Sequence, residues 1–272
     1  MSGVRLEPGR VARVVLDRPE RLNALTLEMA AALPRLLREA LEDPATRVVV
    51  VTGAGRAFCA GADIALLRDL VERQDRGAFA RLVDSAREVL RIVCGSPRPV
   101  IAAVNGAAAG GGANLALACD LRIASDAASI GQTFVRIGLH PDWGGSWLLP
   151  RLVGASRALE LCWTGRMVPA IEARELGLVH RVVPSGAFEE EVAALAASLA
   201  EGPPGALGRI KATMLAAEGR TLEETLDLEL EHQLALFSDP DTAEGLRAFL
   251  EKRRPAYRGV PGEPPPASAR LA

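Results

Sequence analysis

The sequence predicts a mixed α/β fold in which strands alternate with helices, followed by a helical C-terminal region. Short apolar runs at 47–52, 99–104 and 121–124 are typical of strands that are buried on both faces. Segments with helical spacing of apolar residues separate these runs, as expected for parallel strands joined by crossover helices. After about residue 200 the strand patterns stop and only helical periodicity continues.

The N-terminal elements follow the same logic. Residues 11–16 are rich in β-branched side chains that alternate weakly, which indicates a first strand. From Thr26 the apolar residues take helical spacing, and Thr26 itself is a suitable N-cap. Pro34 lies inside this pattern and is expected to kink the helix.

Helical spacing predicts further helices at 76–93, 114–119, 204–217, 221–238 and 241–253. Thr221, followed three residues later by Glu224, forms a capping-box pattern. We therefore expect an α/β core over residues 1–200, which carries the active site, and a helical region over 201–258. A loose tail rich in Pro and Gly is expected over 259–272.

Charge and composition exclude several classes of protein. The formal charge is only −2, from 32 Lys and Arg against 34 Asp and Glu, which disfavours nucleic acid or anionic lipid as a partner. The four cysteines form no CxxC pair and no metal-ligand spacing with histidine, so no metal is expected. The N-terminus has no signal-peptide pattern, and Asn105 and several glycines interrupt the longest apolar run. A cytoplasmic protein with no membrane segment is the expectation.

Three segments could carry chemistry: 57–64, 105–120 and 137–154. The first two follow buried strands, and ligands bind at strand ends in α/β sheets. The glycines 110–112 open a helix, so that free N–H groups and the helix dipole favour a developing negative charge. Two such N–H groups would form an oxyanion hole, although the glycines could equally serve only to make turns. Dinucleotide, P-loop and nucleophile-elbow motifs are absent from the sequence.

Four motifs in order resemble the crotonase superfamily, the enoyl-CoA hydratase/isomerase group: LDRPERLNALT (16–26), VVVVTGAGRAFCAGADI (48–64), AAVNGAAAGGGANLALACDLRIAS (102–125) and GLVHRVVP (177–184). The resemblance covers residues 10–258. It implies a spiral of ββα units with a C-terminal helical trimerisation region, assembled as a homotrimer or hexamer. It also implies an acyl-CoA thioester substrate, with coenzyme A as part of the substrate and no other cofactor.

The resemblance assigns the two oxyanion-hole donors to the backbone N–H groups of Ala62 and Gly111. It places the CoA-binding backbone at Leu22, Ala24, Ala60, Asp63 and Ile64. Asp63 is expected mainly to brace the oxyanion loop. The pocket wall for the acyl group is expected over 65–85.

The chain departs from the hydratase pattern of the family at both catalytic glutamates. Asn114 and Phe134 occupy those positions, and neither an amide nor a phenyl ring can act as a general base. We expect both side chains to line the substrate site instead. Efficient hydration is therefore doubtful.

One carboxylate replaces the pair. Asp142 occupies the position that isomerase branches of the superfamily use as base, and its segment is closest to ring-1,2-epoxyphenylacetyl-CoA isomerases and Δ3,Δ2-enoyl-CoA isomerases. Phe134, Trp143 and Trp147 could raise its pKa, and Trp143 is expected in the substrate site. The competing interpretation is that Asp142 caps the following helix.

The sequence thus predicts an acyl-CoA isomerase with Asp142 as acid and base, in phenylacetate or fatty-acid degradation. A hydratase of low efficiency and a non-catalytic acyl-CoA-binding protein are the alternatives. Cys59 is a weak candidate nucleophile, because a lone cysteine among small residues is usually just packed.

Overall fold

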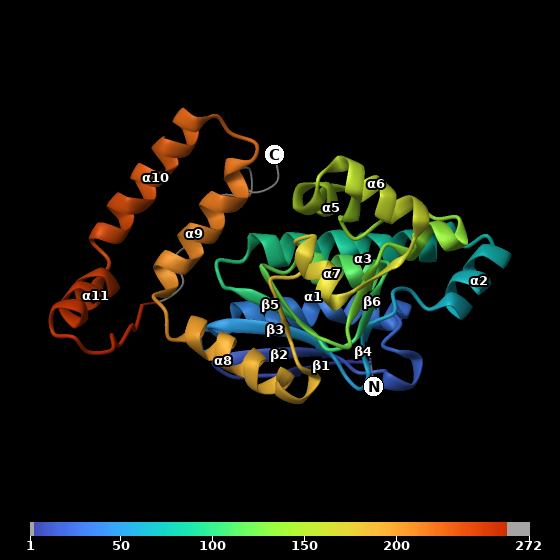
Figure 1. Ribbon diagram of the computed structural model, residues 1–272, viewed down its shortest axis with the longest axis horizontal. Coiled ribbons are helices and arrows are strands. Elements are labelled where there is room, and N and C mark those ends of the chain that lie inside the picture. The colour runs from blue at the N-terminus through green and yellow to red at the C-terminus, as the bar shows by residue number, and fades with distance from the viewer. Residues whose placement is uncertain (1–2, 260–272) are drawn as a thin grey trace.

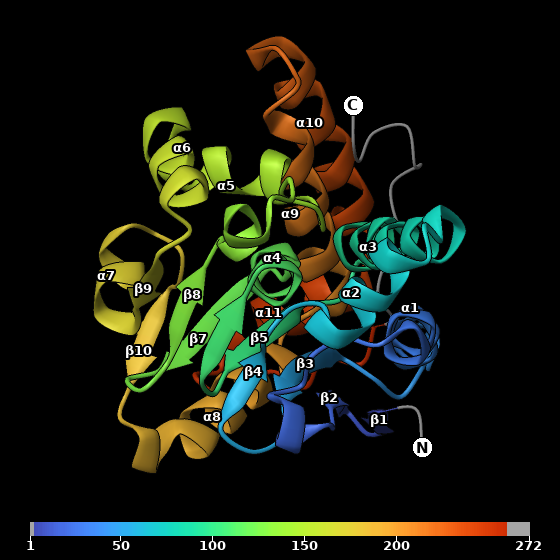
Figure 2. The ribbon, with the colours of Figure 1, turned by 90° about the vertical axis from the view of Figure 1, so that its right-hand side faces the viewer.

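Two sheets form the core of the chain, and the computed structural model describes residues 3–259. The larger sheet has the order β1-β2-β3-β5-β7-β10, with β1 antiparallel and the other strands parallel. Its strands are β1 (Val4–Glu7), β2 (Val11–Leu16), β3 (Val48–Gly53), β5 (Val100–Val104), β7 (Leu121–Ser125) and β10 (Arg181–Val183). Figure 2 shows these strands side by side between the helices that cover the two faces of the sheet. The predicted α/β class is confirmed.

The central strands β3, β5 and β7 are buried on both faces, as their continuous apolar runs predicted. Val49 and Val51 of β3 pack on one side with α1 (Leu27–Glu42), α3 (Arg76–Gly95) and α4 (Gly111–Ala118). Val48 and Val50 pack on the other side against α8 (Phe188–Ala200). Because alternate residues of a strand point to opposite faces, an uninterrupted run of valines serves two cores.

The smaller sheet has the order β4-β6-β8-β9 and was not predicted. Its strands are β4 (Ala57–Cys59), β6 (Ala107–Ala109), β8 (Ser129–Gly131) and β9 (Met167–Pro169). Three residues are too few to show a period, and β6 consists of alanine alone, so local sequence carries no strand signal here. β4 and β6 nevertheless lead directly into the two glycine-containing segments.

The first helix begins as its cap predicts. The hydroxyl of Thr26 accepts a hydrogen bond from the N–H of Met29, and Pro34 lies within the helix. The remaining helices of the core are α2 (Ile64–Glu72), α5 (Gly145–Val153), α6 (Ala155–Thr164) and α7 (Ala170–Glu175). Short 3₁₀ helices occur at Pro19–Arg21, Thr133–Ile137 and Ser185–Ala187.

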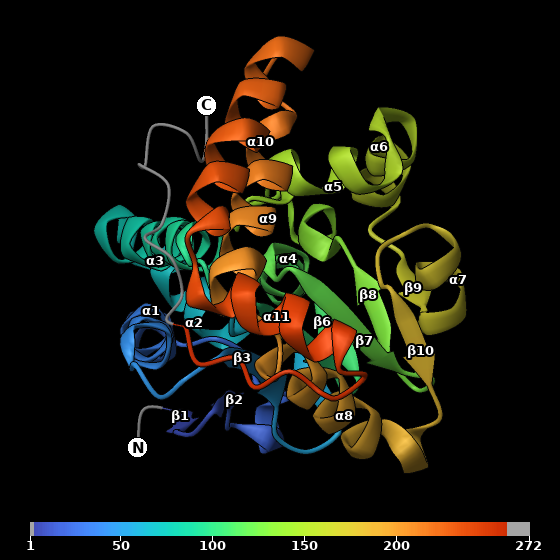
Figure 3. The ribbon, with the colours of Figure 1, turned by 90° about the vertical axis from the view of Figure 1, so that its left-hand side faces the viewer.

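Three helices follow the core: α9 (Pro204–Ala217), α10 (Leu222–Phe237) and α11 (Pro240–Leu250). They stand beside the α/β core rather than on it (Figure 1), and Figure 3 shows α10 and α11 in front of it. The predicted capping box is present, with reciprocal bonds between Thr221 and Glu224. The tail expected after 259 lies outside the described residues. No helix within residues 3–259 is long and apolar enough to cross a membrane.

Candidate active site

The segment after β4 forms a loop that hydrogen bonds to the segment after β2. The N–H of Ala60 donates to the carbonyl of Leu22 at 2.9 Å, and the N–H of Asp63 donates to the carbonyl of Leu25 at 3.0 Å. Leu25 in turn donates to the carbonyl of Gly61 at 2.7 Å. These bonds occupy the N–H groups of Ala60 and Asp63, which precede and follow Ala62 in the loop. The N–H of Ala62 itself donates to no backbone carbonyl within residues 3–259.

Asp63 holds this loop to its surroundings. Its carboxylate caps α2 by accepting from the N–H groups of Ala65 and Leu66, and it accepts from the Arg18 guanidinium at 2.6 Å. Burial alone would raise the pKa of Asp63, but the bonds from Arg18 and the two amides outweigh it and lower the pKa. The carboxylate therefore stays ionised and braces the loop, as expected.

The second loop opens α4, whose eight residues are all buried. Gly61 has φ +88°, and an ideal Cβ on it would lie only 2.8 Å from the carbonyl oxygen of Ala109 and 3.6 Å from the amide nitrogen of Gly111. Only glycine permits so close an approach. The two loops therefore abut, and Ala62 and Gly111 line one cavity.

The amide of Gly111 also donates to no backbone carbonyl within the described part of the chain. As the first residue of α4, Gly111 has an N–H at the positive end of the helix dipole. Two free N–H groups at one cavity are the arrangement that an oxyanion hole requires. The sequence predicted this pair, and the structure brings the two loops together.

Asp142 lines the same cavity from the loop before α5. Its Oδ1 atom is buried and accepts no hydrogen bond within residues 3–259. Burial raises the pKa of Asp142 to about 6, against smaller lowering effects from its own backbone and from His140. A carboxyl group tuned toward neutrality can both take and return a proton near physiological pH.

The competing interpretation of Asp142 as a helix cap is wrong. α5 begins at Gly145, its N-cap is Gly144, and no side chain caps it. Gly144 and Gly145 are instead required by close packing. An ideal Cβ on Gly144 would lie 2.1 Å from Leu90 of α3, and one on Gly145 would lie 2.3 Å from the amide nitrogen of Asn114. The loop is thereby pressed between α3 and α4.

Asn114 does not line either cavity that contains Asp142. It is fully buried, and its Nδ2 donates to the main-chain oxygen of Asp142 at 2.7 Å. Its Oδ1 accepts from Nε2 of Gln132 at 2.7 Å. The side-chain amides of Gln132 and Asn114 thus form two consecutive hydrogen bonds that hold the backbone of Asp142, an arrangement that we call the amide relay. Gln132 could not be identified from the sequence, because no local pattern reveals its contact with Asn114.

Phe134 lines the cavity of the oxyanion loops and is 8% exposed. Ala60 and Ile64 line the same cavity, whereas Leu22 and Ala24 lie behind it on the supporting loop. Asn23, between them, was overlooked. Its buried side chain donates to the carbonyl oxygens of Ala54, Ala57 and Phe58, and so ties the loop after β2 to β4.

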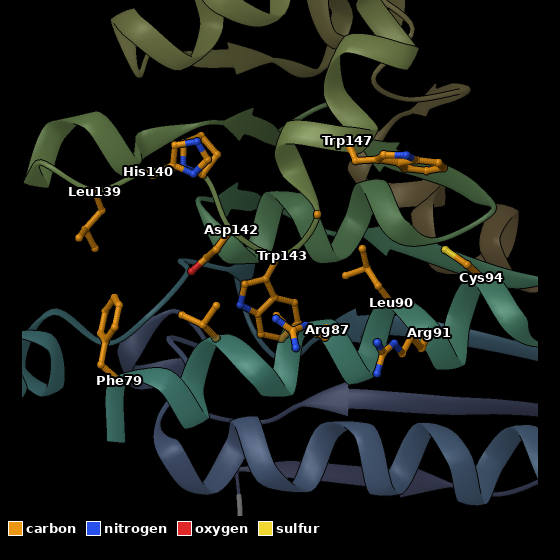
Figure 4. A pocket seen from close by; sticks show the side chains of 14 residues that line it. Phe79, Arg87, Leu90, Arg91, Cys94, Leu139, His140, Asp142, Trp143 and Trp147 are labelled. Atoms are coloured by element: carbon orange, nitrogen blue, oxygen red, sulfur yellow. The ribbon is translucent and has the colours of Figure 1, made fainter. Parts of the chain in front are cut away.

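A larger cavity of about 690 Å³ continues from Asp142 between α3 and α5 (Figure 4). Phe79 and Leu90 of α3 form one wall, and Trp143 and Trp147 lie across from them. The wall was expected over 65–85, but it extends along α3 as far as Cys94. Sequence alone could not fix this limit, because it depends on how far α3 runs beside α5.

Cys59 is not a reactive thiol. It is fully buried, and burial raises the pKa of the Cys59 thiol to about 12, so almost no thiolate exists near neutral pH. Its Sγ lies 3.2 Å from the carbonyl oxygen of Asn23. The interpretation of Cys59 as a packed side chain is confirmed.

In this α/β core, two backbone N–H groups that are unpaired within the described residues lie beside one carboxyl group whose pKa is raised. This arrangement is typical of enzymes that act on an activated carbonyl compound. Comparison with known proteins identifies the family. A model of the enoyl-CoA hydratase/isomerase family matches residues 7–260, and the chain belongs to this family and has its crotonase fold.

Relatives with assigned names agree with this. The chain is 42% identical over 255 residues to a probable enoyl-CoA hydratase of Rhodobacter capsulatus, covering 92% of this chain and 95% of the relative. It is 40% identical over 255 residues to the 1,2-epoxyphenylacetyl-CoA isomerase of Escherichia coli, with the same coverage of 92% and 95%. The crystal structure of an enoyl-CoA hydratase from Bacillus anthracis superposes with a TM-score of 0.88 at 39% identity, covering 94% of this chain and 99% of the other.

Proposed function

We propose that the protein is an acyl-CoA isomerase in which Asp142 moves a proton along the acyl group. The single observation that carries this is the unpaired, buried Oδ1 of Asp142 in the cavity that Ala62 and Gly111 also line. The thioester oxygen would accept from the amides of Ala62 and Gly111. Coenzyme A would be part of the substrate, and the chemistry would use only these groups of the chain.

With a 3-enoyl-CoA, the carboxylate of Asp142 takes the proton from C2. The electron pair of that C–H bond forms the dienolate, whose negative charge the two amides stabilise. The protonated carboxyl group then gives the proton to C4, and the double bond comes to lie between C2 and C3. The other substrate that we consider for Asp142 is an acyl-CoA whose acyl group carries a ring epoxide.

Hydration needs a general base for water and an acid for C2, and the family pattern supplies these from two glutamates. Here Asn114 is committed to the backbone of Asp142, and Phe134 presents an apolar ring. The names of many relatives describe hydration. For this chain we nevertheless propose isomerisation as the main activity and hydration as the alternative.

The test offers a 3-enoyl-CoA and a 2-enoyl-CoA separately to the wild type, to Asp142→Asn and to the control Asp69→Asn on the exposed face of α2. The ultraviolet band of the conjugated thioester should grow from the 3-enoyl substrate. Asp142→Asn should slow this growth by about 10²–10⁴-fold, since a general acid–base contributes that much, and the control should not.

A band that decays from the 2-enoyl substrate, equally fast with Asp142→Asn, would mean hydration without Asp142 and would contradict the proposal. If neither substrate reacts although both bind, the protein is a non-catalytic acyl-CoA-binding protein.

We also propose that the chain assembles as a homotrimer or hexamer. None of the 16 residues of α10 is buried. A stripe of large apolar side chains runs along it with helical spacing: Leu222, Leu226, Leu230, Leu234 and Phe237. Exposed apolar surface of this extent marks an interface, and a second copy of the chain is the occupant that the family resemblance implies.

A further inference from the structure

Trp143 follows the candidate base and forms part of the wall of both cavities. It is 4% exposed and has φ +50°, in the left-handed region that side chains other than glycine rarely adopt. Such a conformation costs about 1–3 kcal/mol and persists only where its surroundings enforce it. The left-handed backbone of Trp143 therefore indicates that the surrounding structure holds this residue in place beside the candidate base.

The edge of the indole that carries the nitrogen lies against the oxyanion loop. An ideal Cβ on Gly111 would lie 3.0 Å from both Cδ1 and Nε1 of Trp143. In Figure 4 the same edge is turned toward the side on which the Asp142 carboxyl group lies. The indole nitrogen is thus adjacent to one proposed oxyanion donor and to the candidate base.

The indole N–H has no hydrogen-bond acceptor within residues 3–259. An indole N–H can only donate, and since it is not among the buried polar atoms that lack a partner, it is open to the cavities that Trp143 lines. Asp142 lines the same cavities, and its Oδ1 is buried and accepts no hydrogen bond within residues 3–259. Two neighbouring polar groups that lack partners within the described residues indicate a ligand that supplies them.

We propose that the indole N–H of Trp143 donates a hydrogen bond to an oxygen atom carried by the acyl group near C3, and so selects oxygenated acyl groups over hydrocarbon ones. The inference rests on the proposed acyl-CoA function. The thioester oxygen already has the amides of Ala62 and Gly111. Trp143 also lines the larger cavity, to which α3 contributes the apolar side chains of buried Ala86 and half-buried Leu90. An ether, epoxide or hydroxyl oxygen there would pair the N–H, whereas a methylene group would leave it unpaired.

The test compares two saturated, unreactive thioesters of equal shape, pentanoyl-CoA and ethoxyacetyl-CoA, which differ by an oxygen in place of the C3 methylene. Isothermal titration calorimetry should show the ether binding about 10–100-fold more tightly to the wild type, since unpaired polar groups discriminate strongly. Trp143→Phe should reduce this ratio to about twofold. Trp147→Phe, in the wall of the same cavity, should retain it.

A second measurement uses the wild-type protein, so that it holds even if Trp143→Phe does not fold. The chain has three tryptophans, and the indole ¹⁵N–H signal of Trp143 can be assigned by elimination with Trp147→Phe and Trp163→Phe. Ethoxyacetyl-CoA should move that signal downfield, and pentanoyl-CoA should not.

Equal affinity of the wild type for both thioesters, an unchanged ratio in Trp143→Phe, or an unmoved indole signal would each overturn the role of Trp143. The proposed isomerase function would survive these results if turnover still required Asp142. Failure of both thioesters to bind would overturn the acyl-CoA site itself, and this inference with it.

Discussion

At the scale of single residues, the proposed mechanism makes the reaction rate depend on the pKa of Asp142. Burial raises this pKa to about 6. Since the base must be ionised to take a proton, kcat/KM for a 3-enoyl-CoA should rise with pH through an apparent pKa of about 6 and then level off. A pH–rate profile from pH 4.5 to 8.5 checks this. A rising limb near pH 4, where an ordinary carboxyl group titrates, would contradict it.

The same shift predicts an effect on stability. The pKa of Asp142 is higher in the folded than in the unfolded chain, so its contribution to stability is present below about pH 4 and is lost as pH rises through about 6. At pH 7.5 the buried charge should cost about 1–3 kcal/mol. Asp142→Asn should therefore raise the melting temperature at pH 7.5 by several degrees, and much less at pH 4. Asp69→Asn should show no such pH-dependent gain, and a less stable Asp142→Asn at pH 7.5 would refute the assignment.

In the proposed mechanism Asn114 is a positioning residue, because its side chain holds the main-chain oxygen of Asp142. In the wild type, Nδ2 of Asn114 lies 2.7 Å from the main-chain oxygen of Asp142. In Asn114→Asp a carboxylate oxygen takes the place of this donor and faces the main-chain oxygen. We expect kcat/KM to fall about 10–100-fold, because small displacements of a catalytic group are costly. The pH–rate limb should also move away from 6, which a merely structural change would not cause. Asn114→Ala, which adds no charge, should have the smaller effect. An unchanged profile in both variants would show that the amide relay is dispensable.

At the scale of elements, α10 packs along α9, where Thr213 and His232 share a hydrogen bond at 2.8 Å, and it leaves its apolar stripe exposed. Leu226 and Leu230 are 45% and 59% exposed, although they lie on the apolar stripe of the helix. The double variant Leu226→Glu, Leu230→Glu should dissociate the oligomer, because charges in an apolar interface lose their hydration. Light scattering after size-exclusion chromatography measures the mass. Glu229→Gln on the same helix is the matched control and should leave the mass unchanged.

If the wild type already has the mass of one chain, the proposed oligomer is wrong, and the stripe on α10 needs another explanation. If the double variant keeps the mass of the wild type, the subunits meet elsewhere.

At the scale of the whole molecule, a partly buried ion pair fastens α9 to the core. Lys211 of α9 donates to Asp120 at 2.8 Å and to the carbonyl oxygens of Val93 and Arg98. Its side chain is 10% exposed. Lys211→Met leaves the carboxylate without its cation, and should lower the free energy of unfolding by about 3–5 kcal/mol. Chemical denaturation measures this loss.

Two further variants test the explanation. Lys252→Met, at an exposed position after α11, should change stability by less than about 0.5 kcal/mol. Adding Asp120→Asn to Lys211→Met should recover part of the loss, since the unpaired charge is gone. A Lys211→Met protein as stable as the Lys252→Met control would mean that α9 is fastened by apolar packing alone.

Periodicity in the sequence located the long elements well. The helix at 204–217 and the strand at 11–16 were predicted with the bounds that the structure has, and the capping box of α10 is present. These features depend on contacts within one or two turns or between neighbouring residues, so local sequence encodes them. The family motifs added what periodicity could not, namely the identity of Ala62, Gly111 and Asp142 as candidates.

Only the tertiary structure decided how those candidates are arranged. The short strands β4 and β6, invisible in the sequence, bring the loops of Ala62 and Gly111 together. The amide of Asn114 holds the loop of Asp142, so the position that resembles a catalytic one became a support for another residue. The environment that raises the pKa of Asp142 and leaves the indole of Trp143 unpaired comes from residues far apart in the chain. Burial and close approach are properties of packed neighbours, and no single segment of sequence contains them.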